Sequence, residues 1–358
     1  MAKKTEYLQT LRTALWGKPI ETPAISEEQM LMHMRQGTAT LVFPSLTMTP
    51  QMKMVCLQNM QQQVKLQHVL SQAWTALTEA GIQPVLMKGA GLAALYPEPQ
   101  MRAWGDIDLF VGIEQYHPAC AVMRATFPEA LKFDEELDHY KHYNLIADGI
   151  SIEIHRVSVG FQHPIDERRY ARIEHFGMTH AIPITNNQSP IPLSVPEPTF
   201  NALFVMLHSW EHMTTMGANM RQLCDLTLLL HHYADRIDRK RLECYLRQLH
   251  LMDVWQLYCC IMVEHLGLPK ADAPFYRWQV RKRAERLLED LLENKMVAPK
   301  ASDKAPKSRV LRKIHTMQER LRNARRIGQY SPAYARHMVA ETMLHGALRF
   351  FAKDRHWE

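Results

Sequence analysis

The stretch "GDIDLFV" at residues 105–111 places two aspartates, Asp106 and Asp108, inside a run that otherwise has the composition of a buried strand. Burying an unpaired carboxylate costs on the order of several kcal/mol or more. Side chains alternate between the two faces of a strand, so Asp106 and Asp108 project from the same face. The fold must therefore leave this face open to solvent or bring a cation to it.

A later strand offers a third carboxylate. The segments "KHYNLIA" and "ISIEIHR" are predicted strands joined by Asp-Gly, the strongest two-residue hairpin pattern. In the second strand, alternation puts Glu153 on one face with Ser151 and His155. A divalent metal removes the repulsion between close carboxylates, and Mg²⁺ prefers one or two carboxylates together with substrate phosphates. We therefore predict that Asp106, Asp108 and Glu153 are metal ligands for Mg²⁺, with Mn²⁺ as the alternative ion.

Upstream, "LMKGAG" supplies a place for an anion. A strand that ends in a glycine opening a helix directs free backbone N–H groups toward a negative charge. The cations Lys88 and Arg102 flank this corner. At this corner, residues 88–91, Lys88 and Arg102 could hold phosphate oxygens beside the backbone of Gly89 and Ala90.

The chain divides by composition into four parts. Residues 1–80 have helical periodicity, residues 81–158 alternate strand and helix, residues 159–198 are proline-bearing, and residues 199–358 are again helical. We predict an α+β fold in which a small mixed sheet is flanked by N-terminal and C-terminal helical domains, with residues 159–198 forming an irregular linker or covering loops.

The six cysteines are scattered and form no CxxC pair, which argues against both a zinc site and a disulfide framework. The chain contains no apolar run of about 18 residues and does not open with a signal-peptide pattern, so we expect a cytoplasmic protein without a membrane partner.

The net charge of +6 comes from one segment of the chain. Residues 300–326 hold ten Lys/Arg and two acids, so this basic segment carries +8 and the remainder of the chain about −2. It could bind RNA electrostatically, but it lacks interleaved aromatic residues, so a solvated connector is favoured over a nucleic-acid partner.

Two pairs in the C-terminal helical part have i, i+4 spacing. His208 and His212 could bind a metal, but no third ligand is in view and helix packing is favoured. Arg221 and Asp225 form an ordinary helix ion pair by default. His155 could equally be a hydrogen-bonded structural residue or a functional one.

This pattern resembles the polymerase-beta-type nucleotidyltransferase superfamily, which has a glycine opening a helix, Asp-x-Asp on a strand, and a third acid on a later strand. More closely, it resembles the bacterial "uncharacterised nucleotidyltransferase" family, with K-G-x-A-L, R-x-x-G-D-I-D-L and E-x-H segments, then a helical His and an R-x-x-x-D pair. The resemblance covers about residues 80–232, and the matching residues are Lys88, Gly89, Arg102, Gly105, Asp106, Asp108, Glu153, His155, His208, Arg221 and Asp225.

The resemblance implies transfer of a nucleoside monophosphate from an NTP, with ATP favoured, to an unidentified acceptor hydroxyl in a two-metal reaction that releases pyrophosphate. Asp106, Asp108 and Glu153 would be catalytic, while His155, His208 and Arg221 would join Lys88, Gly89, Ala90 and Arg102 in binding the nucleotide.

The sequence departs from the superfamily at Ala90, where a serine is usual, and at Gln222 and Leu223, where an aromatic residue is often found. Two alternatives therefore stay open. One is a catalytically silent module that binds a nucleotide or a partner, in a regulatory or antitoxin-like role. The other is an RNA-modifying enzyme that uses the basic segment.

Overall fold

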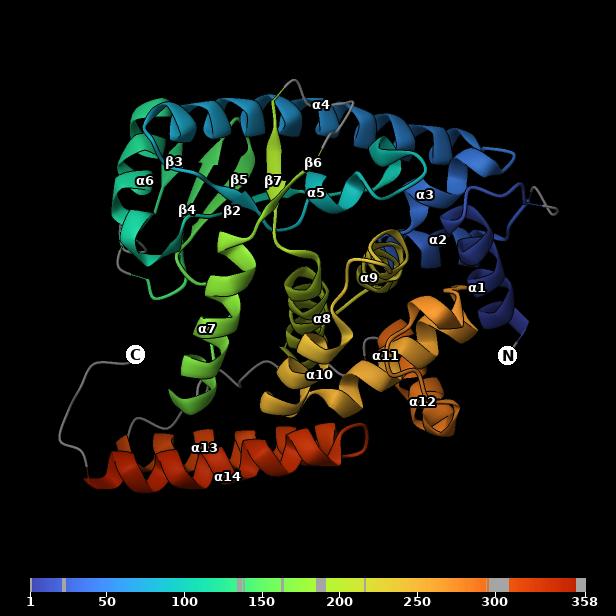
Figure 1. Cartoon of the computed structure of the whole chain (residues 1–358). Helices are drawn as coiled ribbons and strands as arrows, with labels where there is room; N and C mark the ends of the chain where they lie inside the picture. Colours follow the sequence, from blue (N-terminus) through green and yellow to red (C-terminus); the bar gives the residue numbers. More distant parts are fainter. Residues whose placement is uncertain are drawn as a thin grey trace.

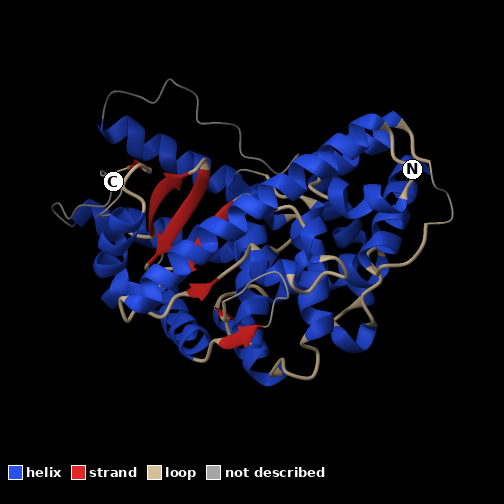
Figure 2. Cartoon of the chain, turned by 90° about the horizontal axis from the view of Figure 1, so that it is seen from above, coloured by secondary structure: helices blue, strands red, loops and turns tan. Residues whose placement is uncertain are grey.

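A computed structural model shows an α+β fold, in which a five-stranded mixed sheet is surrounded by helices (Figure 1). It describes residues 2–20, 24–133, 137, 139–161, 164–184, 191–215, 217–293, 295 and 309–351. Seen from above, the strands of the main sheet gather toward one side of the molecule, and helices make up the other side (Figure 2). The predicted fold class is confirmed.

The α-helices are α1 (Ala2–Leu15), α2 (Glu27–Arg35), α3 (Ala39–Val42), α4 (Pro50–Glu79), α5 (Ala90–Ala93), α6 (Gly112–Thr126), α7 (Pro164–Thr179), α8 (Pro198–Thr215), α9 (Met220–His232), α10 (Arg239–Gln248), α11 (Met252–Glu264), α12 (Arg281–Leu292), α13 (Arg309–Gly328) and α14 (Pro332–Phe351). Short 3-10 helices are η1 (Phe43–Ser45), η2 (Pro99–Met101), η4 (Lys270–Asp272) and η5 (Trp278–Val280). The strands are β1 (Val85–Leu86), β2 (Asp106–Phe110), β3 (Leu131–Lys132), β4 (His142–Ala147), β5 (Ile150–His155), β6 (Ile182–Ile184) and β7 (Leu193–Val195).

The main sheet has the order β1-β2-β5-β4-β3, and only β2 and β5 run parallel. Strands β4 and β5 form the hairpin predicted from Asp-Gly. Its two turn residues, Asp148 and Gly149, have φ of 52° and 77°. Positive φ at both positions is what a tight two-residue hairpin requires. The hairpin prediction is confirmed.

One face of this sheet is closed by α4 and α6. Apolar residues of β2 and β5, such as Ile107 and Ile152, share a buried cluster with the C-terminal half of α4 and with α6, including Leu70 and Met123. Figure 1 shows α4 running along this side of the sheet. Since side chains alternate along a strand, the polar residues of β2 and β5 are left on the opposite face.

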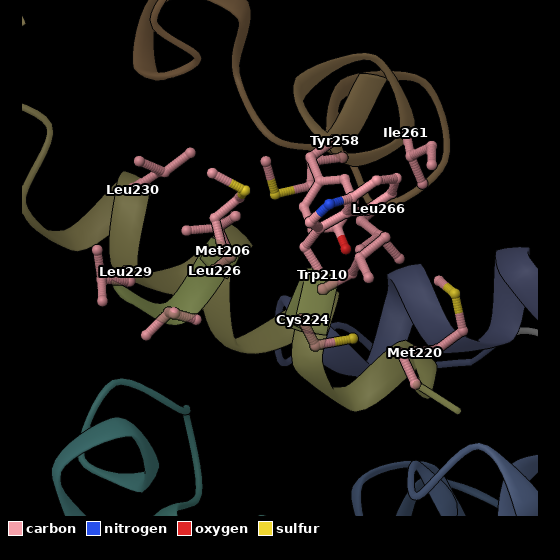
Figure 3. Packing of buried hydrophobic residues seen from close by; sticks show 14 of the residues in the cluster. Met206, Trp210, Met220, Cys224, Leu226, Leu229, Leu230, Tyr258, Ile261 and Leu266 are labelled. Atoms are coloured by element: carbon pink, nitrogen blue, oxygen red, sulfur yellow. The ribbon is translucent and has the colours of Figure 1, made fainter. Parts of the chain in front are cut away.

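A second apolar core lies among the helices. Figure 3 shows its packing, to which α8 contributes Met206 and Trp210, α9 contributes Cys224, and α11 contributes Tyr258. Helices α1 to α3 join this core, so segments from both ends of the sequence lie side by side. The indole Nε1 of Trp16, for example, donates a hydrogen bond of 2.7 Å to the carbonyl of Leu266.

The proline-bearing range 159–198 is not irregular throughout. It contains the sixteen-residue helix α7 and the two-stranded sheet β6–β7, so the prediction of covering loops is wrong for these elements. Pro164 is the first residue of α7 and Pro198 is the first residue of α8. Proline is favoured at the first helical position, because its missing N–H has no intrahelical partner there anyway. The division of the chain into domains stays a prediction.

Helix α7 is tied to the end of β5 by a buried carboxylate. Glu174 Oε1 accepts hydrogen bonds from the Ser158 backbone N–H, at 2.6 Å, and from the Ser158 hydroxyl. Burial raises the pKa of Glu174 to about 7, against the lowering effect of the Ser158 hydrogen bonds. The folded protein therefore takes up a proton that the unfolded chain, with a pKa near 4.5, does not hold at the same pH.

We expect this carboxyl to make the folded state less stable as pH rises from about 4.5 to about 7, by on the order of 3 kcal/mol. Glu174→Gln should remove this dependence, since the amide cannot ionise. Urea denaturation of both proteins across this pH range measures the effect. Parallel stability curves for wild type and variant would contradict it.

In the described part of the chain, no helix combines the length and the apolar character that crossing a membrane requires. Of the basic segment, residues 300–308 lie outside the described residues, and the rest belongs to α13. Arg326, at its end, donates a 3.2 Å hydrogen bond to the carbonyl of Thr214 in α8.

Candidate active site

Three carboxylates converge on the polar face of the sheet. In the parallel pairing of β2 with β5, Asp106 lies opposite Ser151 and Asp108 lies opposite Glu153. One carboxylate oxygen from each of Asp106, Asp108 and Glu153 lies within 4.8 Å of the other two. The convergence that a shared metal site requires is therefore observed.

Two cations lie against the central carboxylate. Lys88 Nζ is 3.0 Å from Asp108 Oδ1, and His155 Nε2 lies 3.1 Å both from that oxygen and from Glu153 Oε2. The second oxygen of Asp108, Oδ2, is buried and has no hydrogen-bond partner within the described residues. A buried carboxylate oxygen without a donor is costly, so this oxygen is available to a cation.

The pKa values of Asp106 and Asp108 are shifted in opposite directions. The charge of Asp108 raises the pKa of Asp106, burial adds to this effect, and Lys88 opposes it. Burial alone would also raise the pKa of Asp108, but Lys88 and His155 outweigh it and hold that pKa well below its usual range. Asp108 is thus ionised, and repulsion from it destabilises a negative charge on Asp106.

The pKa values of the groups around the aspartates are shifted in the direction that favours their charged forms. Burial opposes ionisation in each case, but contacts with the opposite charge prevail. The carboxylates of Asp108 and Asp106 raise the pKa of Lys88, and hydrogen bonds to Asp108 and Glu153 raise the pKa of His155. The hydrogen bond from His155 likewise lowers the pKa of Glu153. The site is a compact array of alternating charges.

The glycine corner, residues 88–91, differs from the structure expected from the sequence. The helix expected to open at the glycine is only the four-residue helix α5, so little helix dipole is directed at an anion. Gly89 has φ of 51°, and a Cβ there would lie 2.9 Å from Trp104 Cε3. Glycine is therefore required at this position by both conformation and contact. Lys88 places an ammonium group at this corner, 3.0 Å from Asp108 Oδ1.

Arg102 is engaged elsewhere. Its Nε and Nη2 donate hydrogen bonds of 2.7 Å each to the two carboxylate oxygens of Asp225, and its Nη1 donates to the carbonyl of Gly89 at 3.3 Å. Tyr96 OH donates to the same carboxylate at 2.7 Å. The default ion pair within the helix is therefore wrong, because Asp225 pairs with Arg102 rather than with Arg221. This buried pair joins α9 to the glycine corner and leaves Arg102 in a supporting position.

Two helices bring cationic or polar groups close to the carboxylates and Lys88. His208 Nε2 of α8 lies 3.5 Å from Lys88 Nζ, and burial together with that ammonium keeps the pKa of His208 well below its usual value. Arg221 of α9 donates a 2.5 Å hydrogen bond to the carbonyl of Ala103. Its charge lowers the pKa of Asp106. The roles of His208 and Arg221 in nucleotide binding stay predictions.

His142 was not among the residues singled out from the sequence. It lies directly opposite His155 in the β4–β5 pairing, with Nδ1 3.9 Å from Glu153 Oε2. Burial lowers the pKa of His142 to about 4, so the ring is neutral at pH 7. The Asp-Gly turn could have revealed this neighbour, since counting back along both strands from the turn places His142 across from His155.

The residues present fit a divalent cation. Three carboxylates are the hard oxygen donors that Mg²⁺ selects, and the orphaned Asp108 Oδ2 lies among them. Asp106 and Glu153 are less buried than Asp108, so a bound substrate could reach the same position. No rearrangement of β2 or β5 is needed to bring the donors together.

A mixed sheet that presents Asp-x-Asp on one strand and a glutamate on its parallel neighbour defines a site of the nucleotidyltransferase type. The chain belongs to the family of uncharacterised nucleotidyltransferases, whose family model matches residues 28–267. This match begins in α2 and extends beyond α11, so it is wider than the 80–232 range recognised from motifs.

Among solved structures, the chain is similar to an antigenic nucleotidyltransferase-like protein from Paracoccidioides brasiliensis, with 14% sequence identity and a TM-score of 0.37. That similarity covers 60% of this chain and 95% of the other. A search of curated proteins finds no match.

Proposed function

We propose that this protein is a metal-dependent nucleotidyltransferase that moves a nucleoside monophosphate from an NTP, with ATP favoured, to an acceptor hydroxyl. The observation that supports this most strongly is the strand-borne set Asp106, Asp108 and Glu153, with the buried Asp108 Oδ2 left without a partner among the described residues. Membership of the nucleotidyltransferase family supports the same reaction class.

In the proposed reaction, Asp106, Asp108 and Glu153 hold Mg²⁺, which neutralises phosphate charge and polarises the α-phosphorus when bound. Lys88 binds phosphate oxygens at the glycine corner. The acceptor oxygen forms a bond to the α-phosphorus in line with the bond that breaks, and pyrophosphate leaves. Glu153, whose side chain is 24% exposed and which lies opposite Asp108, would receive the acceptor proton.

Incubating the protein with cell extract and labelled ATP tests the reaction class even while the acceptor is unidentified. We expect a component of the extract to gain the mass of one nucleoside monophosphate, together with pyrophosphate release. A folded protein that binds no Mg²⁺-nucleotide at about millimolar concentration, within the ordinary range of enzyme affinities, would rule this function out.

We expect Lys88→Met to weaken binding of a non-hydrolysable MgATP analogue by about 10- to 100-fold, because a hydrogen bond to a charged group contributes about 1.5–3 kcal/mol. Lys53→Met is the control, since Lys53 is exposed on α4. Titration calorimetry measures both. Equal affinities for the two variants would remove Lys88 from the phosphate site.

Ala90 supports a second candidate, a binding module without turnover. Ala90 is fully buried and offers no hydroxyl to a phosphate. Such a module would bind MgATP but release no more pyrophosphate than Asp108→Ala across a panel of acceptors. Pyrophosphate release above that background by the wild type would exclude it. The RNA-modifying alternative stays a prediction, and it requires RNA binding that weakens steeply with salt.

A further inference from the structure

We propose that His142, Glu153 and His155 form a second metal site, selective for a late transition metal such as Zn²⁺, which shares Glu153 with the acidic set. The absence of a CxxC pair speaks only against a cysteine-based zinc site, whereas these ligands are two imidazoles and a carboxylate. The proposed site stands on geometry and does not need the nucleotidyltransferase reaction.

The backbone fixes the three side chains on one face. His155 and Glu153 are two residues apart on β5, so they project from the same side of the strand. His142 is the cross-strand partner of His155 on β4 and therefore shares that side. The two imidazole ring centroids lie 5.0 Å apart. Ligands carried on paired strands are held more precisely than ligands on loops.

The distances between ligand atoms suit a small ion. Glu153 Oε2 lies 3.1 Å from His155 Nε2 and 3.9 Å from His142 Nδ1. One ligand atom from each residue lies within 4.8 Å of the other two. Atoms bound tetrahedrally at about 2.0–2.1 Å from zinc are about 3.4 Å apart, which falls between the two distances from Glu153. Small side-chain movements would complete the geometry.

Both histidines offer a ring nitrogen to a metal. His142 Nδ1 is buried and has no hydrogen-bond partner among the residues that the structure describes. His155 is 3% exposed, and its Nε2 points at Glu153 and Asp108. Imidazole ligands favour zinc and its neighbours, while Mg²⁺ prefers oxygen donors. Two histidines and one glutamate, with a fourth position left open, form a known zinc ligand set.

Occupation of this site changes the neighbouring one. Zn²⁺ would take His155 Nε2 from Asp108 and Glu153 from the acidic set, so the two metals compete for Glu153. If the proposed function holds, Zn²⁺ inhibits nucleotidyl transfer by the wild type at a fixed Mg²⁺ concentration. Zinc binding itself is independent of that outcome, and its measurement separates a failure of this site from a failure of the proposed function.

The test is titration of the metal-stripped full-length protein with Zn²⁺ alone. We expect His142→Gln to weaken zinc binding at least about tenfold, the loss that mutation of even an outer-shell partner of a metal causes. The exposed His117 provides a matched control, and His117→Gln should bind Zn²⁺ as the wild type does. Asp106→Asn should also retain zinc affinity while losing Mg²⁺ affinity, because Asp106 belongs only to the acidic set.

A crystal structure of the wild type with Zn²⁺ supplies a second measurement that needs no variant. We expect an anomalous zinc signal between His142 and His155. A signal between Asp106 and Asp108 would overturn the proposal, as would unchanged zinc affinity in a folded His142→Gln protein. Circular dichroism and a thermal melt establish that the variant is folded.

Discussion

We expect Asp106→Asn to abolish nucleotidyl transfer without lowering the stability of the metal-free protein. Metal ligation supplies several kcal/mol of charge stabilisation in the transition state, and about 4 kcal/mol corresponds to a rate loss of about 10³-fold. The stability effect has the opposite sign. Repulsion from Asp108 raises the pKa of Asp106, so a neutral isostere removes an unfavourable charge at pH 7.

Asp108→Asn is the matched comparison. This carboxylate pairs with Lys88 and His155, so its neutralisation should reduce both activity and the free energy of unfolding. The measurements are pyrophosphate release with an extract fraction that the wild type modifies, Mg²⁺ titration, and urea denaturation in chelator. An Asp106→Asn protein that keeps a tenth of the wild-type activity, or that loses as much stability as Asp108→Asn, would falsify the assignment.

The acidic set could be predicted from sequence because it depends on short-range rules. Strand alternation places Asp106 and Asp108 together, and the same rule orients Glu153 on its own strand. What alternation does not give is the parallel register that sets Asp108 opposite Glu153. Packing of the apolar residues of β5 against α4 and α6 fixes the face that Glu153 occupies but not this register, because a shift of two residues keeps the same face. The resemblance to the nucleotidyltransferase family indicated that Glu153 belongs with the two aspartates, which local sequence patterns could not show.

Local spacing misleads where a partner lies far along the chain. The i, i+4 rule assigns Asp225 to Arg221, yet the carboxylate forms its ion pair with Arg102, 123 residues away. Tertiary packing places both members of that pair in the interior, where each charge requires the other as its partner and the two form a bidentate contact. The prolines in residues 159–198 led to a wrong prediction of loops for a related reason. Pro164 begins helix α7, and Glu174 of this helix accepts a hydrogen bond from the Ser158 backbone.

Breaking the buried pair Arg102–Asp225 should therefore strongly destabilise the region around the glycine corner. Its side chains are 6% and 4% exposed, and Asp225 raises the pKa of Arg102 against the opposing effect of burial. We expect Asp225→Ala to cost about 3–5 kcal/mol, because it leaves a buried guanidinium without its counter-charge. Tyr96 also loses the acceptor of its hydroxyl.

Arg221→Met is the control that shows whether loss of another charged side chain in this region costs as much stability as the loss of Asp225. Burial and the charge of Arg102 lower the pKa of Arg221, and the hydrogen bond from its guanidinium to Ala103 is expected to contribute about 1.5–3 kcal/mol, less than the cost of Asp225→Ala. Replacing both members of the buried pair, with Arg102→Met and Asp225→Leu, should recover much of the loss, since no charge is then stranded. Urea denaturation of Arg102→Met, of Asp225→Leu and of the variant with both substitutions gives the coupling energy. If Asp225→Ala and Arg221→Met lower the free energy of unfolding equally, the ion pair expected from helix spacing, and not the pair of Asp225 with Arg102, governs stability here.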